Sequence, residues 1–307
     1  MRRLDALLLT ACVLAAVAGC GGDDDAQAPH TALIVVSPHP DDESIFGAAS
    51  IHRLAADPSR LVAAIYMSGG DKATVPGDCN GIPEVQKVQM IVALRENETR
   101  AAWKVIAPDR DVPITFLRGP DQGLVQSSTL VDGVRADVLS PAGASAVQAA
   151  VETATQLPAS IHSVLFMTAS IYDGHPDHRT AYRAARQAAE VLAARQLDVR
   201  IWSWIIHDEV SMVDVAFCCP GDLHWPANGP TNDYTKLTDT TARPRPPRWN
   251  HVEDVTDLVE LRNTALAQHV SQVVGYPPLC MPDHIPSFYT RWDEKVEEPF
   301  YEDVLAN

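Results

Sequence analysis

Residues 32–43 read ALIVVSPHPDDE, a continuous apolar run that ends in a histidine and three acidic residues. An apolar run without polar alternation is typical of a strand buried on both faces, as in a parallel sheet. The run itself is Ala32–Val36, and similar runs recur at Leu61–Met67, Ile114–Leu117, Val164–Met167 and Val199–Ile206. The sequence therefore predicts a core of buried strands spread along most of the chain.

Helical patterns lie between and after these strands. Apolar residues recur near a period of 3.6 in Pro83–Ile106 and Arg179–Ala194, and a further helix is expected at Leu258–Val273. Strands that alternate with helices predict an α/β fold, here a single doubly wound, Rossmann-like and mostly parallel sheet with helices on both faces. Ligands bind such folds beyond the carboxyl ends of the strands, so catalytic residues are expected directly after strands.

Two short motifs occupy that position. PHPDDE at 38–43 follows the first strand, and GHPDHR at 174–179 follows the fourth. In each motif a proline can start a helix and bring together two residues that are three apart, namely His39 with Asp42 and His175 with His178. Imidazoles and a carboxylate suit a catalytic zinc site with one open position. The alternative is that both motifs are only helix N-termini, where aspartate and proline are common.

The motifs also contain the two proton-transfer groups that an amide hydrolase needs. Asp41 is a carboxylate that can take a proton from water, and His175 is an imidazole that can assist a departing amine. Hydrolysis of an amide therefore fits the residues that remain when His39, Asp42 and His178 bind a metal.

With these motifs in this order, the chain resembles the PIG-L/LmbE-like N-acetylglucosamine deacetylases over most of its mature length. Weaker shared features follow in the family order: Ser68–Asp71, Arg95 with Glu98, Gly119–Leu124 and His269–Gln272. The resemblance implies zinc-dependent hydrolysis of an N-acetylated amino sugar, with His39, Asp42 and His178 as metal ligands. Ferrous iron is the alternative ion for the same ligands.

The resemblance also implies a role for individual residues. Asp41 would be the general base, His175 would stabilise the oxyanion or protonate the amine, and Asp177 would orient His175. Arg95 and Asp121 match positions that resemble sugar-hydroxyl contacts, because arginine donates and aspartate accepts hydrogen bonds. The chain departs from some members at Asp173, where they have a tyrosine, so the tyrosine role does not carry over directly.

The first residues predict export. Two arginines precede a short apolar stretch, and Val17–Cys20 resembles the lipobox of bacterial lipoproteins. We expect residues 1–19 to be a lipoprotein signal peptide, 20–30 a flexible tether and 31–307 one deacetylase domain. Lipid on Cys20 would then anchor the protein to a membrane, facing the periplasm or the cell exterior. An ordinary secretory signal is the alternative.

Charge and cysteines narrow the possible partners. The chain has 40 acidic and 24 basic residues and a formal net charge of −16, so nucleic acid is not an expected partner. In an oxidising compartment we expect Cys79 and Cys280 to form disulfides with the adjacent pair Cys218–Cys219, with the individual partners left open. A cysteine-rich zinc site is the alternative, although the chain has no CxxC spacing.

Two other functions fit the same residues. One is a metal-dependent amidase that acts on a non-sugar amide, and the other is a lipoprotein that binds glycans without hydrolysing them. The sequence does not identify the acetylated substrate, the oligomeric state or the role of the Pro-rich segment 220–250. Outside the motifs, His269, Trp202 and Trp204 are expected to be core residues, and His207–Glu209 are expected to lie on the surface.

Overall fold

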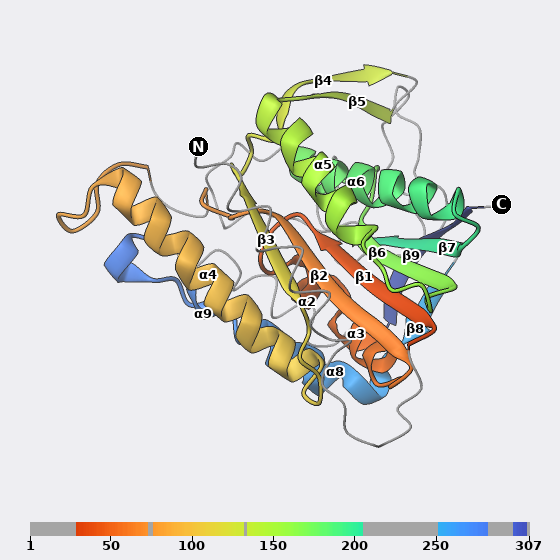
Figure 1. Cartoon of the computed structure of the whole chain (residues 1–307). Helices are drawn as coiled ribbons and strands as arrows, with labels where there is room; N and C mark the ends of the chain where they lie inside the picture. Colours follow the sequence, from red (N-terminus) through yellow and green to blue (C-terminus); the bar gives the residue numbers. More distant parts are fainter. Residues whose placement is uncertain (1–28, 73–75, 132–133, 205–250, 282–296, 306–307) are drawn as a thin grey trace, which may run out of the picture.

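A seven-stranded sheet forms the centre of the protein (Figure 1). The computed structural model describes residues 29–72, 76–131, 134–204, 251–281 and 297–305. The strands in spatial order are β3 (Ile114–Gly119), β2 (Arg60–Ser68), β1 (Thr31–Ser37), β6 (Ser163–Ala169), β7 (Asp198–Trp204), β9 (Glu297–Leu305) and β8 (His251–Asp254). The first five are mutually parallel, and β9 and β8 are antiparallel to their neighbours. The predicted mostly parallel α/β sheet is confirmed.

The apolar run that follows Thr31 forms β1, the central strand. Alternate side chains of a strand point to opposite faces, and both faces of β1 are covered. Leu33 and Val35 pack into one hydrophobic cluster, whereas Ile34 and Val36 pack into another on the opposite face. The absence of polar alternation in the sequence is thus explained by a strand between two cores.

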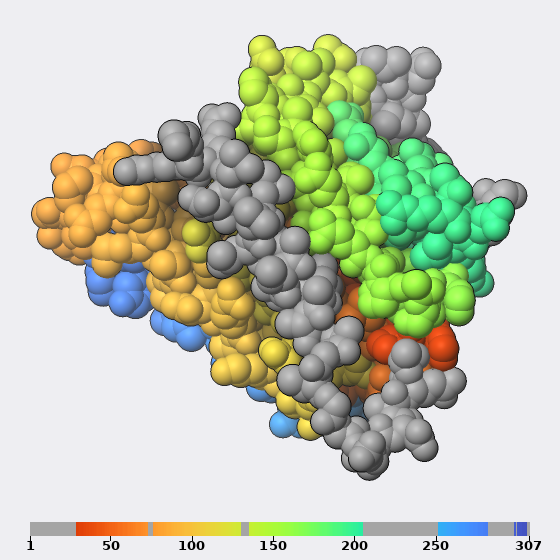
Figure 2. Space-filling view, in the orientation of Figure 1, coloured from red at the N-terminus to blue at the C-terminus, as the bar shows by residue number. Residues whose placement is uncertain are grey.

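Helices cover both faces of the sheet (Figure 1). The elements on one side are α2 (Asp42–Phe46), α3 (Ala48–Ala55), α4 (Glu84–Ile106), η3 (Thr256–Leu258), α8 (Val259–Leu266), α9 (Val270–Val273) and η4 (Pro277–Leu279). On the other side lie α5 (Pro141–Ala154), α6 (Pro176–Ala193) and a hairpin of β4 (Val125–Val131) and β5 (Val134–Leu139). In the space-filling view, α4 lines one edge of the molecule, and α5, α6 and the hairpin line the opposite edge (Figure 2). None of the described helices combines the length and apolar character needed to cross a bilayer.

The single helix expected at Leu258–Val273 is wrong, because two helices occupy this range. The chain forms α8, leaves helical conformation after Leu266 and restarts at Val270 as the short α9. His269 lies at the break with its ring fully buried, and its Nε2 is 3.0 Å from Ser44 Oγ. The contact between the His269 ring and Ser44 accompanies the break in the helix. The expected burial of His269, Trp202 and Trp204 is confirmed.

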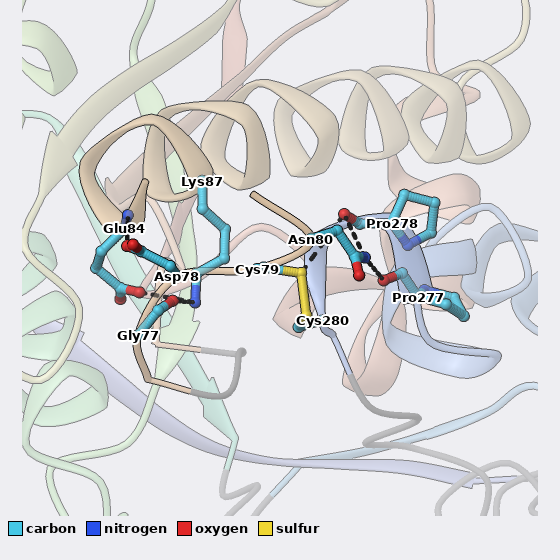
Figure 3. The surroundings of a disulfide bond; sticks show 9 residues. All are labelled: Gly77, Asp78, Cys79, Asn80, Glu84, Lys87, Pro277, Pro278 and Cys280. Carbon is cyan, nitrogen blue, oxygen red and sulfur yellow. Dashed lines mark hydrogen bonds and ion pairs between the residues drawn. A yellow bond between two sulfur atoms is a disulfide. The ribbon is translucent and has the colours of Figure 1, made fainter. Parts of the chain in front are cut away.

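A disulfide joins Cys79 to Cys280, residues 201 apart in the sequence (Figure 3). The expected pairing of these two with Cys218–Cys219 is therefore wrong. The segment before α4 and the segment after η4 lie side by side, and Asn80 Nδ2 donates to the carbonyl oxygen of Pro277 at 3.2 Å. Packing of distant segments sets this pairing, and the order of cysteines in the sequence does not reveal it. Residues 1–28 and 205–250, with the expected signal peptide, most of the tether, Cys218–Cys219 and His207–Glu209, lie outside the described residues.

Candidate active site

The two motifs meet at the carboxyl ends of β1 and β6, which are neighbours in the sheet. The chain leaves β1 toward β2 on one side, while β6 lies on the other, so this edge is a switch point of the sheet. The PHPDDE motif leads from β1 into α2, and the HPDH motif leads from β6 into α6. The strand ends therefore bring together residues that are far apart in the sequence.

Three ligand-type atoms form a compact triangle at this edge. His39 Nδ1 lies 3.2 Å from Asp42 Oδ2 and 3.2 Å from His178 Nε2, and His178 Nε2 lies 3.5 Å from Asp42 Oδ2. All three side chains are buried. Tetrahedral coordination with zinc bond lengths of about 2.0–2.1 Å places ligand atoms about 3.3 Å apart. The spacing of the three residues that the sequence predicts as ligands thus fits a metal ion. His39 and His178 also form a candidate metal-binding group with the buried His175, because ligand atoms of these three rings all lie within 4.8 Å of one another.

A second acidic group faces the other nitrogen of the His39 ring. His39 Nε2 lies 3.3 Å from Asp121 Oδ1 and 3.5 Å from Asp177 Oδ2, and these three residues also bring ligand-type atoms within 4.8 Å of one another. One ring cannot bind the same ion through both nitrogens. The predicted ligand set uses the Nδ1 side, where His178 completes the triangle, and leaves Nε2 facing carboxylates, which commonly hold the opposite nitrogen of a metal-bound histidine.

The surrounding carboxylates favour positive charge at these rings. Burial lowers the pKa of His39, but the charge of Asp121 and hydrogen bonds to Asp121, Asp177 and Asp42 raise it well above its usual range. Burial likewise lowers the pKa of His178, and the charges of Asp173 and Asp42 outweigh that effect. Burial raises the pKa of Asp121, but the His39 ring lowers it more. A cluster that stabilises bound protons in this way can also stabilise a divalent cation.

Asp41, the predicted base, directly precedes Asp42 in the chain, and its carboxylate is held by Arg95. Its Oδ2 is 2.8 Å from Arg95 Nη2, and Arg95 Nη1 donates to the carbonyl oxygen of Gly70 at 2.7 Å. Gly70 has a φ of +62°, and a Cβ added there would lie 1.7 Å from Arg95 Nη1. Glycine at position 70 therefore provides the space in which Arg95 reaches Asp41.

His175, the predicted acid, is the N-cap residue of α6. Its Nδ1 accepts a hydrogen bond from the Asp177 backbone N–H at 3.2 Å, so a neutral His175 ring carries its hydrogen on Nε2. The ring centroid lies 4.8 Å from that of His39 and 5.0 Å from that of His178. His175 is thus next to both histidines that are predicted to bind the metal.

The structure places three other predicted residues in unexpected contacts. The Asp177 carboxylate accepts from the Gln122 N–H at 2.7 Å and faces His39, so its contact with His175 is made by the backbone. Asp121, a predicted sugar contact, accepts from the Lys72 N–H at 3.1 Å and faces His39. Arg95, the other predicted sugar contact, is engaged by Asp41. The site brings all of them together, and their roles toward a substrate stay predictions.

Sequence reasoning did not assign a role to Asp173. The residue is 1 % exposed, and its Oδ2 lies 3.1 Å from Nδ1 of the predicted ligand His178. The signal available in the sequence is an aspartate directly before the GHPDHR motif, two residues from His175.

Comparison with known proteins gives a family match for half of the chain. Residues 34–189 match the family model described as PIG-L, GlcNAc-PI de-N-acetylase. No curated protein sequence matches the chain. Solved structures similar to it include the N,N′-diacetylchitobiose deacetylase from Pyrococcus horikoshii, with 16 % identity, a TM-score of 0.46 and coverage of 99 % of this chain and 94 % of that chain.

Two further solved structures show a comparable likeness. The 4-carboxy-2-hydroxymuconate hydratase from Pseudomonas putida KT2440 has 14 % identity, a TM-score of 0.48 and coverage of 91 % of this chain and 97 % of that one. A teicoplanin deacetylase has 15 % identity, a TM-score of 0.44 and coverage of 90 % and 99 %. At these TM-scores the structures carry no assignment of activity.

Proposed function

The chain belongs to the PIG-L family, and from that membership we propose that it is a metal-dependent deacetylase. The proposed reaction is hydrolysis of the N-acetyl group of an N-acetylglucosamine-type sugar or glycoconjugate. The observation that carries the proposal is the buried triangle of His39, Asp42 and His178, with ligand atoms 3.2–3.5 Å apart and with Asp41 and His175 beside it. A protein that only binds glycans would need neither Asp41 nor His175.

Zinc is the proposed ion, with ferrous iron as the alternative, and when bound it would polarise the amide carbonyl as a Lewis acid. The residues of the chain then divide the proton transfers. Asp41, fixed by Arg95, takes a proton from the attacking water. His175 stabilises the oxyanion or donates a proton to the nitrogen as the carbon–nitrogen bond breaks, and the products are acetate and a free amine.

An acetylated amino sugar is the substrate class that the family description supports. Arg95 and Asp121 remain the predicted sugar contacts, and their partners Asp41 and His39 put both side chains next to the reacting groups. The amidase alternative uses the same five residues on a non-sugar amide, so only turnover distinguishes the two.

The proposal places the enzyme outside the cytoplasm, held to a membrane by lipid on Cys20. The lipobox-like sequence that ends at Cys20 supports it. The disulfide between Cys79 and Cys280 also supports it, because disulfides persist mainly in oxidising compartments.

Acetate release tests the proposal. The substrates are N-acetylglucosamine, N,N′-diacetylchitobiose and an N-acetylglucosaminyl lipid, with an N-acetylated amino acid as the non-sugar comparison. We expect release from at least one sugar, and we expect Asp41→Asn to abolish it. Release from the amino acid alone would favour the amidase. Binding of sugars without release by the metal-loaded protein would contradict both enzymes and favour the glycan-binding alternative.

A further inference from the structure

Asp173 joins the two histidines of the HPDH motif through its two carboxylate oxygens. Its Oδ1 accepts from the His175 backbone N–H at 2.8 Å, and its Oδ2 makes an ion-pair contact of 3.1 Å with His178 Nδ1. That nitrogen is opposite His178 Nε2, the atom that faces His39 and Asp42. We propose that Asp173 is the positioning residue of the metal ligand His178. The inference rests on the proposed metal centre.

The contact fixes which nitrogen of His178 is available to a metal. A positive or hydrogen-bearing Nδ1 is favoured 3.1 Å from the Asp173 carboxylate, and a hydrogen on Nδ1 leaves the Nε2 lone pair free for coordination. Carboxylates in this position also increase the basicity of the coordinating nitrogen. Because Asp173 and His178 are both fully or almost fully buried, water does not replace this partner easily.

The two contacts require a carboxylate and not merely a polar residue of the same shape. The His175 N–H donates to one oxygen of Asp173, and the other oxygen faces His178 Nδ1, which carries a hydrogen when Nε2 binds a metal. Asparagine has one acceptor oxygen and one amide nitrogen that only donates. In Asp173→Asn, one of the two contacts would therefore face donor against donor, although the side chain keeps its volume.

The backbone of Asp173 is held by Arg179. Arg179 Nη1 donates to the carbonyl oxygens of Asp173 and Gly174, each at 2.8 Å. The same guanidinium forms two hydrogen bonds to the Asp137 carboxylate in β5, through Nε at 2.7 Å and Nη2 at 2.9 Å. The β4–β5 hairpin thus fixes the loop that carries Asp173, and Arg179 and Asp137 support the metal site without contacting the ligand atoms described above.

Zinc affinity of the full-length protein, measured by competition with a chromophoric chelator, tests the proposal without a substrate. We expect Asp173→Asn to bind zinc about 10- to 100-fold more weakly than the unmodified protein. The matched control is Asp57→Asn, the same change at a carboxylate that accepts from the Ser59 N–H at 2.9 Å directly before β2, at the edge of the sheet opposite the site. It should bind zinc normally. Zinc affinity within twofold of normal in folded Asp173→Asn would overturn the proposal.

Arg179→Lys is the second variant, in case Asp173→Asn does not fold. Lysine keeps the charge but lacks the planar fork, so the loop loses part of its support, and we expect a smaller weakening of zinc binding in the same direction. Normal affinity in this variant, with Asp173→Asn unfolded, would overturn the proposal. If the unmodified protein binds zinc but releases no acetate, the proposed function fails, while weakened zinc binding in Asp173→Asn would still support the positioning role.

Discussion

Replacement of Gly70 by alanine tests how the general base is held. An added Cβ would lie 1.7 Å from Arg95 Nη1, which is closer than any real contact. The backbone need not move, because the end of an arginine side chain can swing away. Arg95 would then lose its 2.8 Å ion pair with Asp41 and its 2.7 Å hydrogen bond to the Gly70 carbonyl oxygen.

Gly70→Ala should lower the free energy of unfolding for two reasons. Breaking a buried ion pair leaves Asp41 without compensation and costs about 3–5 kcal/mol, and a Cβ at the left-handed φ of +62° adds about 1–2 kcal/mol of strain. Gly81→Ala is the matched control, because Gly81 also has a positive φ, +82°, but an added Cβ there meets nothing within 4 Å. Gly81→Ala should therefore show the backbone strain without the loss of an ion pair.

The assay is urea unfolding of both variants, together with the kcat of acetate release. Gly70→Ala should be less stable than Gly81→Ala by about 3 kcal/mol or more, and its kcat should fall at least about tenfold because the base is no longer fixed. Equal stability of the two variants, or a normal kcat in Gly70→Ala, would refute the role of Gly70 in placing Arg95 against Asp41.

Four other predictions rest on contacts described above. The Cys79–Cys280 disulfide joins residues 201 apart in the sequence, so its removal should lower the free energy of unfolding by up to about 5 kcal/mol. Urea midpoints that are the same with and without reductant would contradict this. The pKa values of His39 and His178 are raised, so both rings still hold protons above about pH 6.5 and zinc must displace them. Zinc affinity should therefore rise with pH, by up to about tenfold per pH unit for each proton displaced. An affinity that is flat from about pH 6 to 8 would argue against these ligands. Over the same range the metal-depleted protein should lose stability as pH rises, since each raised pKa stabilises the folded form only while the ring holds its proton. Asp41→Asn should lower kcat by about 10²- to 10⁴-fold with a normal metal content and little change in KM, and a near-normal kcat would exclude Asp41 as the base.

The parallel strands and the ligand set could be predicted because their signals are local. The apolar run before Pro38 has no polar alternation, which only a strand covered on both faces requires. His39 and Asp42 lie three apart within one motif, so their proximity depends on a single turn of chain. His178 joins them because both motifs follow strands, and strands of one parallel sheet end at the same edge.

The remaining features depend on contacts between distant segments. The sequence does not show that Arg95 is aimed at Asp41 or that Asp121 faces His39, because each pair comes from separate elements whose side chains meet only in the folded sheet. The β4–β5 hairpin was missed for a different reason, because its polar, partly exposed segment around Ser128 lacks a buried apolar run. Asp173 was visible as a residue, but its role appears only when both carboxylate oxygens have partners.

Metal content tests the central claim most directly. The unmodified protein, dialysed against a chelator and then against buffered zinc, should retain about one equivalent of metal per chain. His178→Ala should retain far less, because it removes one corner of the triangle with His39 Nδ1 and Asp42 Oδ2. His162→Ala, at an exposed histidine, is the control and should retain the full equivalent. A full equivalent of metal in folded His178→Ala would contradict the proposed metal centre.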